Sequence, residues 1–168
     1  MNYLSILVAL PVAGAVLLGA LRNATDKLLK QITLGTSLVS LAVALAMAGA
    51  FDPNSSSAMQ FVEKYDWIPA FGVSFSLGVD GISLVLIVLA AILVPVVLLA
   101  GWNESEGHRG TVRQYLVLTL LTYSMMVGVF AATDVFLFYV FFEAILIPMY
   151  FLIGRFGGQR ATYAAVKF

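Results

Sequence analysis

Five long apolar stretches, separated by short polar segments, dominate the hydrophobic pattern of the chain. A helix needs about 20 mostly apolar residues to cross the hydrocarbon core of a bilayer, and each stretch approaches that length. The pattern therefore predicts an all-α transmembrane fold with five membrane-spanning helices. The expected helices cover residues 2–21, 31–51, 82–102, 114–132 and 134–153.

The segment between the second and third helices has a different period. Residues 73–79, VSFSLGV, alternate apolar with small residues, and a period of two is typical of a strand. Residues 60–68, QFVEKYDWI, can supply the partner strand, with PAFG as the connection. We expect a short external β-hairpin on the membrane surface, with Tyr65 and Trp67 at the level of the lipid headgroups.

The end of the chain predicts the start of a sixth helix. Residues 154–160, GRFGGQR, are rich in glycine and arginine and suit a helix end followed by a turn. From about residue 159 a helical pattern resumes, but it is too short to cross a bilayer. We therefore expect the chain to be the N-terminal membrane part, residues 1–168, of a longer protein.

Composition strengthens the membrane interpretation and narrows the chemistry. Only 11% of the residues are charged, whereas a soluble domain has about a quarter. The chain has no cysteine, which excludes disulfides, thiolate zinc sites and iron–sulfur ligation within it. Its net charge of zero gives no attraction to nucleic acid. The single histidine, His108, has no partner at metal-ligand spacing and is interpreted as a solvated loop residue.

The distribution of lysine and arginine predicts an orientation. If five helices alternate across the membrane, Lys64 alone falls on one side and the other eight basic residues fall on the opposite side. Basic residues favour the cytoplasmic side, so the N-terminus is expected outside and the segment after the fifth helix inside. The eight are Arg22, Lys27, Lys30, Arg109, Arg113, Arg155, Arg160 and Lys167.

One charged residue interrupts the fifth apolar stretch. In FLFYVFFEAILIPMY, residues 136–150, only Glu143 is charged, and it follows the expected helix start at Asp134 by about 13 Å. An acidic residue at the centre of a bilayer costs about 2.5–3.5 kcal/mol on insertion scales. Glu143 is therefore expected to face protein, water or a cation, as a buried carboxylate that transfers protons. The alternative is a hydrogen-bonded acid that only clasps two helices together.

Neighbouring residues extend this candidate site. Tyr139 and Tyr150 lie four residues before and seven after Glu143, so the helical period places all three on one face. Pro148 lacks the N–H that would bond the carbonyl of Ala144, which leaves a free carbonyl beside the acid. The three side chains and this carbonyl could form a hydrated proton path.

Hydroxyl side chains also recur on two other helices. The expected explanation is close helix packing with hydroxyls bonded to carbonyls of their own helix, and the alternative is a hydrated lining. The residues are Thr119 and Thr122, in a stripe with Tyr115 and Met126, and Thr33, Thr36, Ser37 and Ser40. Asp134 and Asp80 precede helices and are expected to cap them.

Two stretches carry a resemblance to a known family. Residues 75–102, FSLGVDGISLVLIVLAAILVPVVLLAGW, and residues 132–154, ATDVFLFYVFFEAILIPMYFLIG, resemble the third and fifth transmembrane segments of the antiporter-like subunits of respiratory complex I, the NADH:quinone oxidoreductase. The forms LGVDGIS and FFEAILIPMYFLIG are most similar to the M branch of that family.

The resemblance implies a function for the chain. Members of this family are many-helix, proton-translocating subunits without a cofactor, and their fifth helix carries a glutamate that matches Glu143. Its usual partner, a lysine of a later helix, has no counterpart in this sequence. The resemblance further implies a non-redox subunit in a bacterial inner membrane, with other complex I membrane subunits and the lipid bilayer as its partners. NADH, FMN, iron–sulfur clusters and quinone would then be bound by partner subunits. Two rivals are a subunit of a cation/proton antiporter and a purely structural membrane subunit.

Overall fold

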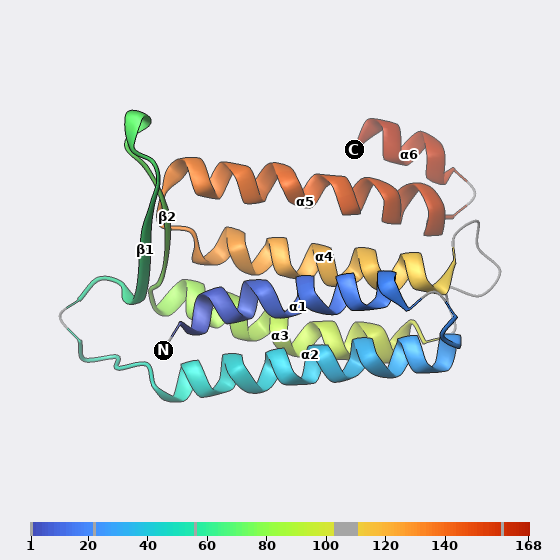
Figure 1. The fold of residues 1–168 in the computed structure, drawn as a ribbon, viewed down its shortest axis with the longest axis horizontal. Helices are drawn as coiled ribbons and strands as arrows, with labels where there is room; N and C mark the ends of the chain where they lie inside the picture. The colour runs from blue at the N-terminus through green and yellow to red at the C-terminus, as the bar shows by residue number, and fades with distance from the viewer. Residues whose placement is uncertain (1, 22, 56, 103–110, 159) are drawn as a thin grey trace.

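A computed structural model describes residues 2–21, 23–55, 57–102, 111–158 and 160–168 as a bundle of long helices with a two-stranded hairpin across one end (Figure 1). The helices are α1 (Tyr3–Ala20), α2 (Asp26–Gly49), α3 (Gly81–Ala100), α4 (Val112–Ala131), α5 (Val135–Phe156) and the short α6 (Ala161–Lys167). The hairpin consists of β1 (Gln60–Ile68) and β2 (Val73–Val79), joined by the 3₁₀ turn Pro69–Phe71. Helices α1 to α5 are long and apolar enough to cross a membrane, as the hydrophobic pattern predicts.

Helix α4 forms the centre of the bundle. It packs against α1, α5, α3 and α2, and its inner residues Leu120, Tyr123 and Val127 are almost completely buried. Helix α5 has fewer neighbours: it packs mainly on α4 and on α6, which folds back along it (Figure 1). One side of α5 is therefore open in the described part of the chain.

Helices α4 and α5 approach each other closely at Gly128. A Cβ atom added to Gly128 would come within 2.5 Å of the ring of Phe141, which is only 8% exposed. Because the ring is packed, it cannot move aside freely. Only a residue without a side chain fits at this contact.

We therefore expect Gly128→Ala to destabilise the protein by about 1–3 kcal/mol, as overpacking of a close contact does. Thermal unfolding in detergent would measure the loss. Gly35→Ala is the matched control because its Cβ would meet nothing within 4 Å. If the Gly128 variant unfolds at the same temperature as this control, the contact is softer than the structure indicates.

The two strands of the hairpin lie where the sequence predicts them, and the external location of the hairpin stays a prediction. Strands β1 and β2 pair antiparallel, with Tyr65 opposite Phe75 and Asp66 opposite Ser74. Gly72 closes the connection with φ of 67°, a left-handed conformation that glycine adopts readily. Tyr65 and Trp67 are both about half exposed, and the Trp67 ring contacts Phe136 of α5 edge to face.

The hairpin also fixes the ends of two helices. Glu63 of β1 is buried and accepts hydrogen bonds from the backbone N–H groups of Leu4 and Ser5, at 3.0 and 3.2 Å, and from the Ser5 hydroxyl. A carboxylate at the N-terminus of α1 satisfies backbone donors and complements the helix dipole. On β2, the Ser76 carbonyl accepts a bond from the Thr133 N–H at the start of the α4–α5 connection.

Several helix boundaries differ from the predicted ones. Helix α2 begins at Asp26 rather than 31, so Lys30 lies inside a helix instead of in a loop. Helix α4 begins at Val112 rather than 114, because Thr111 and Gln114 form a capping box. Helix α5 continues to Phe156 rather than 153. Helix α6 begins at Ala161, and the predicted start near 159 lies outside the described residues.

Basic side chains gather at the end opposite the hairpin. The C-terminal ends of α1, α3 and α5 and the first turns of α2 and α4 all lie there, whereas α1 begins at the hairpin end (Figure 1). Of the described basic residues only Lys64 belongs to the hairpin; Lys27, Lys30, Arg113, Arg155, Arg160 and Lys167 belong to the opposite part. Arg22, Arg109 and His108 lie outside the described residues.

Candidate functional site

Glu143 lies in the middle of α5, on its open side. It follows the first residue of the helix, Val135, by about 12 Å along the axis. Helix α5 packs on α4 through its opposite side, where Leu137, Phe141 and Pro148 are buried. The Glu143 side chain is exposed in this chain.

No described part of this chain buries Glu143, so the expectation that it faces protein, water or a cation stays a prediction. The physical reason for its exposure is the position of α5 at the edge of the bundle, where no described element covers this side. The cost of placing a carboxylate at this depth in lipid remains, because it follows from the apolar surroundings of the helix. A charged group on this side requires water, a cation or another protein segment against it.

Two phenol groups lie near the carboxylate, as the helical period predicts. The Tyr139 side chain is one turn before Glu143 and close enough for its hydroxyl to interact with the carboxylate. Tyr150 lines a shallow hollow together with Glu143, Leu146 and Ile147. Both tyrosines are exposed, at 57% and 44%. The open side of α5 thus presents one acid between two hydroxyls.

Pro148 occupies a different position from these three residues. It is buried, on the side of α5 that faces the bundle, so its ring does not line the surface around Glu143. Helix α5 runs through it without interruption from Val135 to Phe156. Its predicted role, to free the Ala144 carbonyl, would act through the backbone rather than through contact.

Thr119 and Thr122 lie apart from Glu143. They line a hollow of about 490 Å³ between α3, α4 and α5, with Tyr115 and Met126 of the same stripe. Their hydroxyls donate to the carbonyls of Tyr115 and Leu118, each at 2.8 Å. The hydroxyls on α2 likewise bond to carbonyls of their own helix, at Leu29, Ile32, Leu34 and Thr36. The hydroxyl bonds to carbonyls of the same helix are as expected, but Thr119 and Thr122 line a hollow rather than a close helix contact, so a hydrated lining stays the alternative for them. These two threonines and Glu143 line different hollows.

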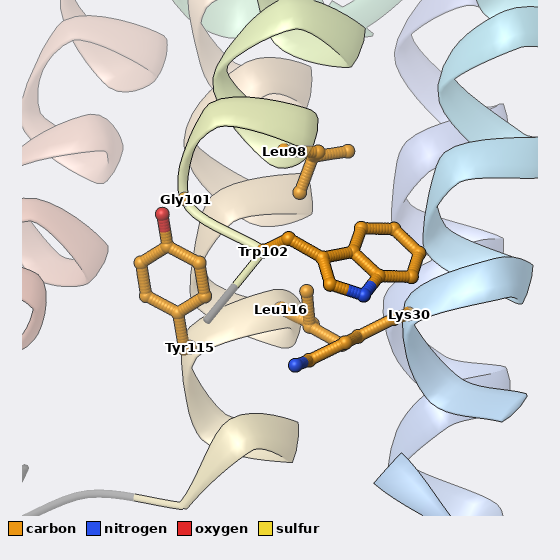
Figure 2. A pocket seen from close by; sticks show the side chains of 6 residues that line it. All are labelled: Lys30, Leu98, Gly101, Trp102, Tyr115 and Leu116. Carbon is orange, nitrogen blue, oxygen red and sulfur yellow. The ribbon is translucent and has the colours of Figure 1, made fainter. Parts of the chain in front are cut away.

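Sequence reasoning missed one buried cation. Lys30 is 7% exposed, and its ammonium nitrogen lies 5.6 Å from the centre of the Trp102 ring. Figure 2 shows the Trp102 ring at the end of α3, beside the Lys30 side chain from α2. The sequence feature that indicates this position is Asp26, because an acidic residue directly after Thr25 is typical of a first helical turn. A helix that begins at Asp26 contains Lys30.

Two aspartates cap helices outside the spanning segments, as predicted. Hydrogen bonds from the Ser74 and Leu137 backbone N–H groups hold the pKa of Asp134 below its usual range. Bonds from the backbone and the side chain of Ser83 lower the pKa of Asp80 in the same way. Among the described residues, no three His, Cys, Asp or Glu side chains gather as metal ligands. These acids are therefore explained by helix capping.

Comparison with known proteins gives consistent matches. Residues 132–168, which include Glu143, match a family model described as NADH:quinone oxidoreductase/Mrp antiporter, transmembrane. The whole chain is similar to NADH-quinone oxidoreductase subunit M of Mycobacterium tuberculosis, with 44% identity over 99% of this chain and 35% of the relative. It is 39% identical to NADH-ubiquinone oxidoreductase chain 4 of Arabidopsis thaliana, over 98% of this chain and 33% of the relative.

Two solved structures share the fold. A chain of respiratory complex I from Thermus thermophilus with bound NADH matches 96% of this chain and 31% of its own length, with a TM-score of 0.77 and 28% identity. A chain of the membrane-bound sulfane sulfur reductase, an archaeal respiratory membrane complex, matches 99% of this chain and 24% of its own length, with a TM-score of 0.75. Its identity of 17% supports the fold alone. The chain spans about a third of the curated relatives it matches.

Proposed function

Because this chain belongs to the family of antiporter-like membrane subunits found in NADH:quinone oxidoreductases and Mrp antiporters, we propose that it serves a proton-pumping NADH:quinone oxidoreductase. Within that complex it would contribute Glu143 to a proton path across the membrane. The similarity to subunit M relatives extends over the whole chain and supports this assignment. In this role the chain is a non-redox part of an enzyme complex.

The observation that carries the proposal is the open side of α5. Glu143 is in the middle of a membrane-length helix, exposed, with Tyr139 and Tyr150 on the same side. A carboxyl group takes up a proton in apolar surroundings and releases it when water or a cation approaches. An exposed acid at this depth can meet both conditions in turn if a moving cation or water chain lies against α5. The phenol hydroxyls can donate and accept the intervening hydrogen bonds.

The basic end of the bundle supports an orientation for this path. We place the hairpin and the N-terminus outside and the α5–α6 connection in the cytoplasm of a bacterial cell with the protein in its inner membrane. Protons would then pass Glu143 between the two sides. In this proposal the chain itself holds no redox cofactor, and partner subunits bind NADH, FMN, iron–sulfur clusters and quinone.

A second candidate is a subunit of an Mrp-type cation/proton antiporter. The family description that matches residues 132–168 names both kinds of complex, which favours this alternative over unrelated transporters. Such a complex would exchange cations for protons without oxidising NADH. A third possibility, a structural subunit in which Glu143 clasps a neighbouring helix, is separated from both by substitution of the acid.

Purification of the full-length protein with its native partners tests the assignment. Membranes are solubilised mildly, and the complex is captured through a tag on this subunit and reconstituted into vesicles. We expect NADH to drive quinone reduction and acidification of the vesicle lumen, both inhibited by the same quinone-site inhibitor. Sodium-driven proton exchange without NADH oxidation would instead identify an antiporter complex.

A further inference from the structure

A groove at the basic end of the bundle, far from the hairpin, is lined by two arginines. Helices α1 and α5 both pack on α4, and the ends of the three helices leave a hollow of about 360 Å³ between them. Arg113 of α4 and Arg155 of α5 line it, and none of the described residues that line it is acidic. The groove adjoins the hollow that Glu143 lines, since Phe151 lines both, but Glu143 does not line the groove.

Polar and apolar groups are segregated along this groove. Arg113 is the second residue of α4, and Arg155 is the last but one of α5, so both guanidinium groups belong to the helix ends. Val117, Leu118 and Phe151 lie about one turn further into the bundle, roughly 6 Å deeper. A molecule in this groove would therefore meet positive charge at the membrane surface and hydrocarbon below it.

Both arginines are held in place by contacts at the groove. The Arg113 side chain donates a hydrogen bond to the Leu21 carbonyl at the end of α1, at 2.8 Å. The Arg155 guanidinium lies 5.6 Å from the centre of the Phe151 ring. A guanidinium carries five N–H donors in a planar fork, a geometry that suits phosphate oxygens. Two such groups, from different helices, line this one groove.

Gly19 of α1 leaves the third wall of the groove open. A Cβ atom at this position would meet nothing within 4 Å, and a hydrogen in its place leaves room for a hydrocarbon chain. The groove thus combines a cationic head, an apolar floor and an unfilled wall. A phospholipid has the complementary sequence of a phosphate followed by acyl chains.

We infer that this groove binds an anionic phospholipid, with its phosphate between Arg113 and Arg155 and one acyl chain along Val117, Leu118 and Phe151. The two positive charges favour a headgroup with net negative charge over a zwitterionic one, because the cationic amine of the latter is repelled. The bound lipid would fill the space between α1 and α5 and link the two helices at this end. The inference does not depend on proton transfer by Glu143.

Photo-crosslinking of the full-length protein in its native complex tests the inference. The complex is placed in phosphatidylcholine nanodiscs that contain a trace of photoreactive phosphatidylglycerol or, separately, photoreactive phosphatidylcholine, each with the reactive group in an acyl chain. We expect phosphatidylglycerol to label the peptides that carry Val117, Leu118 and Phe151 and phosphatidylcholine to label them several-fold less. Equal labelling by the two probes would overturn the preference for an anionic lipid.

Substitutions then separate this groove from the general positive charge of the surface. Arg113→Gln combined with Arg155→Gln should reduce labelling at least about tenfold, because both charged hydrogen-bond donors to the phosphate are removed. Arg160→Gln combined with Lys167→Gln removes the same charge outside the groove and should retain most of the labelling. If both double variants lose labelling equally, the lipid is attracted only by the general positive charge of the surface, and the proposed binding site is contradicted.

A pair of glycine variants tests the groove without changing charge. Gly19→Leu should fill the wall and suppress labelling, whereas Gly35→Leu, on the open face of α2, should leave it unchanged. If Arg113→Gln destabilises α1 by removing the hydrogen bond to the Leu21 carbonyl, the glycine pair still tests lipid binding in the groove. Labelling that survives Gly19→Leu, or crosslinks from the groove to a protein segment instead of lipid, would overturn the inference.

Discussion

Glu143→Gln should abolish NADH-driven proton pumping or reduce it strongly in the intact complex, while the subunit still assembles. Glutamine keeps the shape and the hydrogen-bonding capacity of the side chain but cannot bind and release a proton. The variant would therefore retain the contacts of α5, and the side chain at position 143 would no longer change its charge. Pumping is measured as acidification of vesicles by a pH-sensitive dye, and assembly by native gel electrophoresis.

Milder substitutions should give graded losses. Glu143→Asp keeps the charge but shortens the reach by one methylene, so we expect part of the pumping to remain. Tyr139→Phe and Tyr150→Phe remove the hydroxyls on the same side of α5 and should lower pumping less than Glu143→Gln does. Tyr163→Phe is the matched control, because Tyr163 is an exposed phenol on α6, away from the acid.

Two results would contradict the role of Glu143. If the glutamine variant fails to assemble while the aspartate variant assembles, the carboxylate acts as a clasp between helices. If glutamine and wild type pump protons equally well, Glu143 has no part in the path. Glu143 is exposed among the described residues, so a clasp would have to join α5 to a protein segment outside them. The first result would therefore also show that such a segment contacts α5.

Local periodicity predicted the hairpin and the helix caps well, for a physical reason. A strict period of two over residues 73–79 and a Pro–Ala–Phe–Gly connection leave little freedom for the backbone. Asp80 and Asp134 precede long apolar runs, where an acceptor for the first N–H groups is needed. The start of α2 was missed because its first turn is polar and basic and resembles a loop.

Long-range packing was not predictable from the same patterns. Periodicity placed Glu143, Tyr139 and Tyr150 on one side of a helix, but it could not say whether another element covers that side. The bond between Glu63 and the start of α1 joins residues 59 positions apart, and no local pattern distinguishes Glu63 from the other acids of the hairpin segment. Only the arrangement of the helices decides such contacts.

Cysteine labelling should separate the two ends of the bundle completely. Ser57→Cys, beside the hairpin, is expected to react with a membrane-impermeant maleimide added to intact cells, because basic residues favour the cytoplasm and the hairpin end carries only Lys64 among the described ones. Asn23→Cys, between α1 and α2, should react only after the cells are permeabilised. Both positions are exposed, and residues 1–168 have no cysteine of their own.

The controls for this experiment use the same two positions. The parent protein shows the background from cysteines elsewhere in the full-length chain, and labelling after permeabilisation shows that both variants are reactive. The reverse pattern would invert the orientation and move the hairpin to the cytoplasm. Labelling of both positions from outside would contradict the odd number of crossings between Asn23 and Ser57, and with it the assignment of α2 as a spanning helix.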